Sequence, residues 1–262
     1  MTDVASDAVV SGLWRYPVKS LQGAPVERID LSETGVAGDR QWGIVDVATG
    51  KVLTAKRWPL LLEASAALDA DGRDVTVALP DGATWRSGDP ATDEALSAWL
   101  DHEVRLRHAN ADGGTPYELT MDPADDESEP WDFATPAGSF VDLAAVHLLT
   151  TASLSAISNR QPDGQWEVHR FRPNALVDTA SASGFVEDGW SGGQVRLGDA
   201  VVDVFMATPR CTMPGRAQPS RGLARDLSIV RTVRDHHDNN LGVYGAVAVP
   251  GPVAVGDPVR RT

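Results

Sequence analysis

The chain has a single cysteine, Cys211, which follows Pro209-Arg210 and lies three residues before Pro214. A thiolate is both a nucleophile and a soft metal ligand, and a neighbouring guanidinium favours the thiolate over the neutral thiol. A free cysteine can also pack as a small hydrophobic residue. Taken alone, Cys211 therefore has three possible roles: nucleophile, metal ligand or packing residue.

Four basic residues stand where a strand is expected to end or begin. Lys19 follows Tyr-Pro-Val, Arg40 follows a glycine-rich turn, Arg172 precedes Pro-Asn, and Arg210 precedes the cysteine. Side chains at strand ends can converge on one rim of a barrel. Each base could instead pair with a surface carboxylate. Four bases together with one thiol favour a shared site.

The composition limits the class of partner. The 37 acidic residues outnumber the 23 basic ones, which gives a formal net charge of −14. Such a chain lacks the clustered basic surface of a nucleic-acid-binding protein, so we expect no nucleic-acid partner, and an anionic ligand must be bound by a few local bases. No apolar run approaches the roughly 20 residues that span a bilayer. A single thiol and an acidic N-terminus without a signal-peptide pattern predict a cytoplasmic, non-membrane protein.

Several known motifs are absent or incomplete. The sequence has no Gly-x-Ser-x-Gly, no Gly-x-Gly-x-x-Gly and no Cys-x-x-Cys. Lys19-Ser20 lacks the preceding glycine of a phosphate-binding P-loop. The adjacent His236 and His237 would point to opposite faces of an extended segment, which favours a solvated loop over a metal site. With no cysteine cluster for an iron–sulfur centre, any redox chemistry needs electrons from another protein.

The elements that must position these residues are mainly strands. Short β-branched runs separated by Gly, Pro and Asp predict a strand-rich barrel or sandwich. The predicted strands are Ala8–Trp14, Val26–Leu31, Trp42–Val47, Asp74–Leu79, Val201–Phe205, Leu227–Val233 and Leu241–Val249. The dipeptides Asp71-Gly72 and Asp81-Gly82 on either side of Asp74–Leu79 predict hairpin turns.

Two segments have helical spacing. Asp89–Leu100 has an early proline and early acids before its apolar residues, and Thr151–Ser158 would direct Leu154 and Ile157 inward. The acidic, proline-bounded run Met121–Pro130 predicts a domain junction.

Several longer motifs carry a family resemblance. In the first half these are Tyr16-Pro17-Val18-Lys19-Ser20, Gly35 with Asp39-Arg40, and Val52-Leu53-Thr54. In the second half they are Arg170-Phe171-Arg172-Pro173-Asn174, Glu187-Asp188-Gly189-Trp190, Pro209-Arg210-Cys211, Gly242-Val243-Tyr244 and Gly251 with Val255-Gly256-Asp257-Pro258-Val259. In this order they resemble MOSC-domain proteins, the molybdenum cofactor sulfurase C-terminal type, which are preceded by an N-terminal β-barrel domain.

The resemblance implies a fold that is mainly β with a few helices. An N-terminal MOSC-associated β-barrel domain, residues 1–120, would pack on a MOSC β-barrel domain, residues 130–262. It also implies a molybdenum cofactor (Mo-molybdopterin), with Cys211 as the catalytic thiolate ligand of molybdenum. The residues expected to hold the pterin and its phosphate are Lys19, Ser20, Arg40, Arg172, Asn174, Arg210 and Tyr244.

Among similar proteins, the amidoxime-reducing components imply an oxidoreductase that reduces small N-hydroxylated compounds, such as hydroxylamine-type bases and amidoximes, to amines. Electrons would come from a separate ferredoxin-, cytochrome- or flavoprotein-like donor. This chain departs from its relatives in three respects. Pro209 stands where relatives often carry serine, so one polar contact to the cofactor is expected to be missing, and neither the mitochondrial membrane anchor nor a fused ferredoxin domain is seen.

Three other functions remain open from the sequence. Cys211 could carry a persulfide in a sulfur carrier or sulfurtransferase. The chain could be a non-catalytic carrier of the molybdenum cofactor, or a relative whose pocket no longer binds anything.

Overall fold

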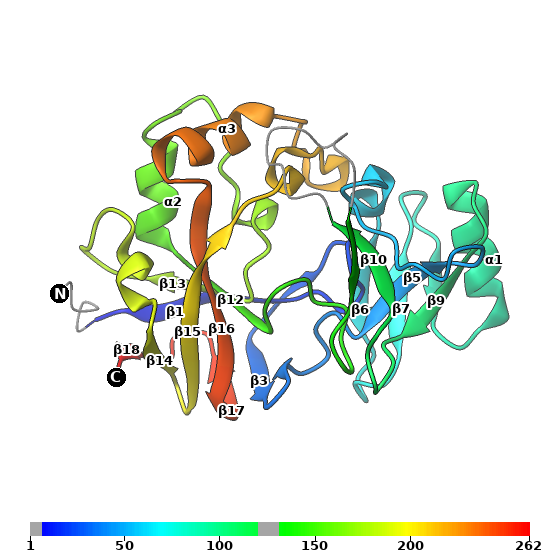
Figure 1. Cartoon of the computed structure of the whole chain (residues 1–262), viewed down its shortest axis with the longest axis horizontal. Helices are drawn as coiled ribbons and strands as arrows, with labels where there is room; N and C mark the ends of the chain where they lie inside the picture. The colour runs from blue at the N-terminus through cyan, green and yellow to red at the C-terminus, as the bar shows by residue number, and fades with distance from the viewer. Residues whose placement is uncertain (1–6, 120–130) are drawn as a thin grey trace.

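A computed structural model describes residues 7–119 and 131–262. The chain is mostly β, and its strands form two bodies that lie side by side in Figure 1. The structure confirms the predicted fold class of a mainly β protein with a few helices.

The larger body is built on an eight-stranded sheet with the strand order β18-β14-β15-β16-β12-β13-β1-β2. Its strands are β1 (Val9–Arg15), β2 (Ala24–Val26), β12 (Val146–Thr150), β13 (Ala175–Asp178), β14 (Gly193–Leu197), β15 (Ala200–Pro209), β16 (Asn240–Val249) and β18 (Val259–Arg261). A bridge between Val9 and Pro258, with a hydrogen bond from the Val259 amide to the Ala8 carbonyl at 2.8 Å, joins β1 to the start of β18. The sheet therefore curls round until its two ends meet, as in a barrel.

A three-stranded sheet adjoins this barrel, with the order β17-β3-β4. It contains β3 (Arg28–Ser32), β4 (Gly35–Val36) and β17 (Gly251–Ala254). Ile29 and Leu31 from β3 are buried in the same core cluster as Val195 and Val202 from the barrel. The first forty residues thus help to build the core of the C-terminal half.

The smaller body holds the remaining strands and the first helix. Its strands are β5 (Trp42–Asp46), β6 (Ser65–Leu68), β7 (Val75–Ala78), β8 (Thr84–Arg86), β9 (Val104–His108), β10 (Pro116–Leu119) and β11 (Trp131–Ala134). They pair as β5-β9, β6-β7-β8 and β10-β11. The turns at Asp71-Gly72 and Asp81-Gly82 do join β6 to β7 and β7 to β8, as predicted.

The helices confirm two predictions and correct a third. α1 (Pro90–Leu100) begins after the cap Asp89, and α2 (Thr151–Ser158) has the predicted bounds. Residues Leu227–Val233, predicted as a strand, belong to α3 (Leu227–His236). Its buried residues Ile229, Val230 and Val233 recur at helical spacing, and the Asp226 side chain caps the amide of Ser228, so this local pattern overrides the β-branched composition. Short 3₁₀ turns occur at Pro59–Glu63, Val168–Arg170, Val186–Trp190, Met213–Gly215 and Pro219–Arg221.

The two sequence units interlock. Strands β1 and β2 extend the sheet of the C-terminal half, and β3 pairs with β17. The division into 1–120 and 130–262 stays a prediction, and its proposed junction at 121–130 lies outside the described residues. None of the helices in residues 7–119 and 131–262 is both long and apolar enough to cross a bilayer.

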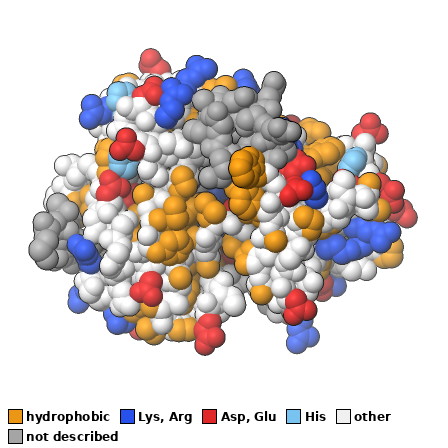
Figure 2. Space-filling model, viewed as in Figure 1, with side chains coloured by type: hydrophobic (Ala, Val, Ile, Leu, Met, Phe, Trp, Pro, Cys, Tyr) orange, Lys and Arg blue, Asp and Glu red, His pale blue; other side chains and the backbone are white. Residues whose placement is uncertain are grey.

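The surface has no extended basic region on the described part of the face in Figure 2. Acidic and basic side chains alternate around it, and hydrophobic side chains gather over β15 and β16, where Phe205 and Met206 are exposed. Several basic side chains instead line a cleft.

Candidate functional site

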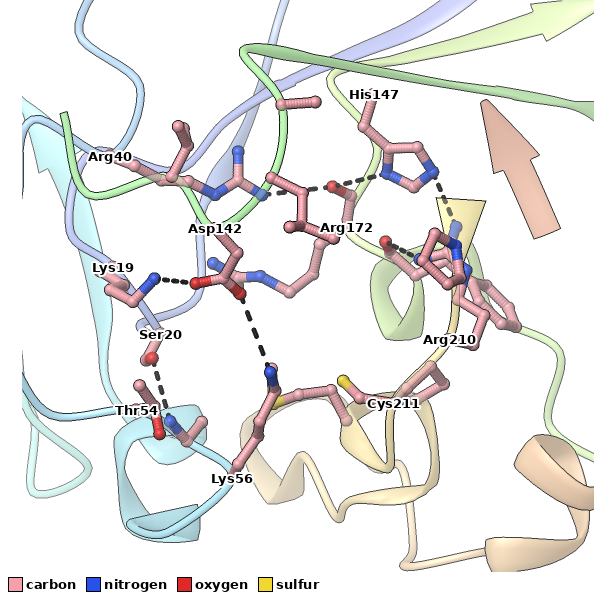
Figure 3. Close-up of a pocket in the computed structure, with 18 of the residues that line it drawn as sticks. Lys19, Ser20, Arg40, Thr54, Lys56, Asp142, His147, Arg172, Arg210 and Cys211 are labelled. Carbon is pink, nitrogen blue, oxygen red and sulfur yellow. Dashed lines mark hydrogen bonds and ion pairs between the residues drawn. The ribbon is translucent and has the colours of Figure 1, made fainter. Parts of the chain in front are cut away.

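The cleft spans about 850 Å³, including the part that is open to solvent, and is lined from both halves of the chain. All eight predicted site residues line it: Lys19, Ser20, Arg40, Arg172, Asn174, Arg210, Cys211 and Tyr244. Figure 3 shows six of them around one space. The convergence of strand-end bases that the sequence predicted is therefore observed.

One wall holds an ion-pair cluster of Lys19, Asp142 and Lys56. The Lys19 ammonium group donates to the Phe140 carbonyl at 2.7 Å and to the Asp142 carboxylate, whose other oxygen lies 4.0 Å from the Lys56 ammonium nitrogen. Burial lowers the pKa of Lys19, and Asp142 opposes that effect. Desolvation would raise the pKa of Asp142, but the Lys19 and Lys56 charges hold it well below its usual range. The cluster carries a net positive charge into the cleft.

A second wall places two arginines over one tyrosine ring. The guanidinium carbons of Arg40 and Arg172 lie 4.8 and 4.2 Å from the ring centroid of Tyr16. Asp39 binds Arg40 and also accepts a hydrogen bond from the Tyr16 amide at 2.7 Å. Burial, aided by the Arg40 charge, lowers the pKa of Arg172 to about 10, while Asp39 raises the pKa of Arg40 against the effect of burial, so both arginines are cationic at pH 7. The aromatic ring and the carboxylate make this pairing of like charges tolerable.

The backbone at this wall is unusual. Ser20, Arg40 and Arg172 have φ angles of 71°, 49° and 54°. Non-glycine residues in this left-handed region are uncommon and tend to cluster at functional sites. The three predicted residues are thus held in conformations that point to a site.

The third wall contains Arg210 at the end of β15. Its guanidinium donates to the carbonyls of Leu241 and Phe171, at 2.9 and 3.2 Å, and lies 2.7 Å from the His147 ring. Burial lowers the pKa of Arg210 to about 10, so it remains charged at pH 7.

Cys211 follows Arg210 and is partly exposed, with its sulfur pointing into the cleft (Figure 3). The loop beyond it is fixed by the buried Arg170, which donates to the carbonyls of Pro214, Arg216 and Ala224 at 3.0, 3.0 and 2.8 Å. The Arg216 side chain in turn donates to the Lys56 carbonyl at 2.8 Å. Arg170 therefore acts on the loop that presents the thiol.

Two buried polar atoms on the lining have no protein partner among the described residues. They are the side-chain nitrogen of Asn174 and the hydroxyl oxygen of Thr54. Asn174 is 1% exposed, and its amide oxygen accepts from the His147 backbone at 3.1 Å. Leaving buried polar groups unpaired is costly, so an acceptor and a donor from a ligand would complete this site.

Three titratable lining residues lie outside the motifs that the sequence singled out: Lys56, Asp142 and His147. Asp142 and His147 interrupt the apolar run 141–149, and Lys56 comes two residues after Val52-Leu53-Thr54. Polar residues inside an apolar run near a recognised motif are the signal that could have identified them.

The histidine pair His236-His237 lies at the end of α3, where His237 is engaged in other contacts. His237 stacks on Phe185 at 3.5 Å and its ring lies 2.8 Å from the Asp188 carboxylate, while His236 is exposed. Within residues 7–119 and 131–262, no group of three His, Cys, Asp or Glu could hold a metal ion. The predicted solvated loop is in fact a helix end with one ordered histidine.

The donor set of the cleft fits a thiolate-bound metal with an anionic organic group. Six cationic side chains line it, together with one thiol and, among the described residues, one carboxylate. Cations and unpaired amide or hydroxyl groups suit a phosphate, and a soft sulfur suits a sulfur-ligated metal. This concentration of cations stands in a chain of net charge −14.

Comparison with known families matches almost the whole chain. Residues 7–107 match the model described as MOSC N-terminal beta barrel domain, and residues 136–260 match the one described as MOSC domain.

The curated relatives include mitochondrial amidoxime-reducing components 1 and 2. Mitochondrial amidoxime-reducing component 1 of Homo sapiens is 23% identical over 290 residues, covering 95% of this chain and 82% of the relative. The protein of that name from Xenopus laevis is 27% identical over 303 residues, covering 99% and 83%. Among solved structures, the YUAD protein from Bacillus subtilis has a TM-score of 0.48 and 12% identity, with coverage of 96% and 93%.

Proposed function

The chain belongs to the MOSC family, with a MOSC N-terminal beta barrel domain followed by a MOSC domain, and on that premise we propose that it is a molybdenum-cofactor-dependent oxidoreductase. Its substrates would be small N-hydroxylated compounds, including hydroxylamine-type bases and amidoximes, which it reduces to amines. The names of its relatives support an N-reductive activity.

One observation carries the proposal: the lone thiol, Cys211, lines the same cleft as six cationic side chains in a strongly acidic chain. A general surface role for these bases would not gather them around the cysteine. An anionic cofactor bound through a thiolate would need both features.

Each predicted residue has a role in this proposal. Cys211 is the thiolate ligand, and Arg40, Arg172, Arg210 and Lys19 neutralise the phosphate and orient the pterin. The unpaired side-chain nitrogen of Asn174 would donate to the pterin, and Ser20 and Tyr244 line the cleft that would hold it.

The reaction consumes two electrons and two protons, because R–NH–OH gains two hydrogens and loses water to give R–NH₂. The cofactor, when bound, would supply the two-electron chemistry. A separate ferredoxin-, cytochrome- or flavoprotein-like protein would supply the electrons. We propose that Lys56, whose side chain lines the cleft 4.0 Å from Asp142, would supply a proton to the departing oxygen.

We further propose that residues 1–120 and 130–262 are the two domains, with β1 to β4 shared between their folds. A cytoplasmic location remains our proposal and rests on the single thiol.

N-reductive activity is tested with protein purified from a host that makes the cofactor. Wild-type protein should convert benzamidoxime to benzamidine with an artificial electron donor, and Cys211→Ala should not. A labile extra sulfur on Cys211 in intact-mass spectra, without N-reduction, would instead indicate a sulfur carrier. Bound pterin without N-reduction would indicate a cofactor carrier.

A further inference from the structure

His147 on β12 contacts several predicted site residues although it is not one of them. Its side chain is 5% exposed and lies at the cleft wall. Figure 3 shows its ring between Arg172 and Arg210. The residue therefore stands at the point where the two arginine-bearing segments meet.

The hydrogen bonds of the ring assign its protonation. Arg210 has only donors, so the Nε2 atom of His147, 2.7 Å from the guanidinium, must be an acceptor. The carbonyl of Arg172 can only accept, so Nδ1, at 3.3 Å, carries the hydrogen. The ring is thus neutral and protonated on Nδ1. Burial and the Arg210 charge hold its pKa well below the usual value.

The backbone of His147 fixes a third residue. The His147 amide donates to the Asn174 side-chain oxygen at 3.1 Å, and the Asn174 amide donates to the His147 carbonyl at 2.8 Å. Asn174 lines the cleft, and its side-chain nitrogen has no hydrogen-bond partner among the described residues.

The ring is packed against β16 at Tyr244 and Gly242. Tyr244 packs edge-on against it with the ring centroids 5.4 Å apart. A Cβ at Gly242 would lie 2.7 Å from Nε2, so only glycine fits there. The imidazole is held firmly enough to orient what it binds.

The donors of Arg210 are nearly all committed. Its five N–H groups are matched by two bonds to Leu241, one to Phe171 and one to His147, which leaves one N–H free of described acceptors. Removing the His147 acceptor would leave the guanidinium held only by the Leu241 and Phe171 carbonyls and would loosen its orientation.

We propose that His147 is a positioning residue, whose neutral ring binds Arg210 and the Arg172 carbonyl and thereby orients both arginines toward a bound phosphate group. The proposal rests on the proposed function in one respect, which is that the phosphate group is taken to belong to the molybdenum cofactor. The binding of a free phosphate is the property it predicts directly.

The first experiment measures inorganic phosphate binding to the apo protein by calorimetry. His147→Leu, which removes both hydrogen bonds, should weaken binding about tenfold, equivalent to ~1.4 kcal/mol. His147→Gln, whose amide can accept and donate, should bind within about threefold of wild type. His108→Leu removes a histidine that packs on Trp42 away from the cleft lining, and should leave binding unchanged.

Equal phosphate affinity of His147→Leu and wild type would overturn the proposal, as would equal losses in the Leu and Gln variants. No phosphate binding by wild type would overturn it too. Wild-type protein that binds phosphate in this pattern but is purified without pterin would refute the proposed function and leave the role of His147 intact.

A second measurement uses only the wild-type protein, so it does not require any variant to fold. Nitrogen-15 NMR of histidine-labelled wild-type protein should show His147 neutral and protonated on Nδ1 at pH 7. The Nε2-protonated tautomer, or an imidazolium, would contradict the assignment. A histidine that only fills space would lack the two hydrogen bonds that select this tautomer.

Discussion

At the scale of the residue, the cleft is lined by cationic side chains, and specific neighbours stabilise their charges. Asp142 lies between Lys19 and Lys56, and the Tyr16 ring lies under Arg40 and Arg172. Cys211 differs from them, because no described hydrogen bond or ion pair commits its sulfur. Such a thiol is available for a metal.

Replacing Cys211 by alanine should abolish molybdenum-dependent activity and change the free energy of unfolding by less than about 1 kcal/mol. The side chain is partly exposed, so its loss leaves no large cavity. Urea denaturation together with metal analysis checks both parts. A large fall in stability would point to a packing role.

Replacing Asp142 by asparagine should lower stability by about 1 kcal/mol at pH 6, the worth of a partly exposed ion pair. The folded pKa of Asp142 is depressed, so its contribution is complete above the unfolded pKa of about 3.9 and is lost as the pH falls further. The difference between wild type and variant should therefore shrink below pH 4. Urea titrations from pH 3 to 6 measure it, and a constant difference would contradict this cause.

Sequence reasoning found the eight residues that stand in motifs, and all eight line the cleft. It missed Asp142 and Lys56 because side-chain charge alone cannot tell which of 37 acidic and 23 basic residues turn inward. That choice depends on which strand ends meet in space.

At the scale of the element, β12 and β16 bring His147 opposite Tyr244, and close approach of the strands requires glycine at 242. The sequence predicted most strands and two helices from alternation, turns and caps. It was wrong for Leu227–Val233, because a short β-branched run with buried residues three and four apart fits a strand by composition and a helix by spacing.

Gly242→Ala should destabilise the protein by about 1–3 kcal/mol more than Gly256→Ala, because the new methyl group meets His147 and the Leu148 carbonyl. Gly256 is the matched control, since its φ of +93° is close to the +83° of Gly242 but open space surrounds it. Thermal unfolding compares them. Equal losses would mean that backbone conformation alone matters.

Asp226→Ala should lower stability by about 1 kcal/mol, because the Asp226 side chain caps α3 by accepting from the Ser228 amide at 2.9 Å. Asp226→Asn keeps an acceptor and should lose much less. Calorimetric unfolding distinguishes them. If the alanine variant were as stable as wild type, the cap would not hold α3 in place.

At the scale of the whole molecule, the cleft exists because both halves of the chain contribute to it. Strands β1 and β2 join the C-terminal sheet, and Arg172 donates to the Leu21 carbonyl at 2.8 Å across 151 residues of sequence. The family resemblance predicted two barrels in sequence order, but local patterns could not reveal that β1 to β4 complete the other half. Such pairing depends on contacts between residues far apart in the chain.

The most direct measurement is the molybdenum and pterin content of wild-type protein purified from a host that makes the cofactor. Metal analysis and the fluorescence of the oxidised pterin should give about one of each per chain, as expected for a cofactor held by Cys211 and the cationic cleft. Protein that is folded but carries neither molybdenum nor pterin would contradict the proposed function.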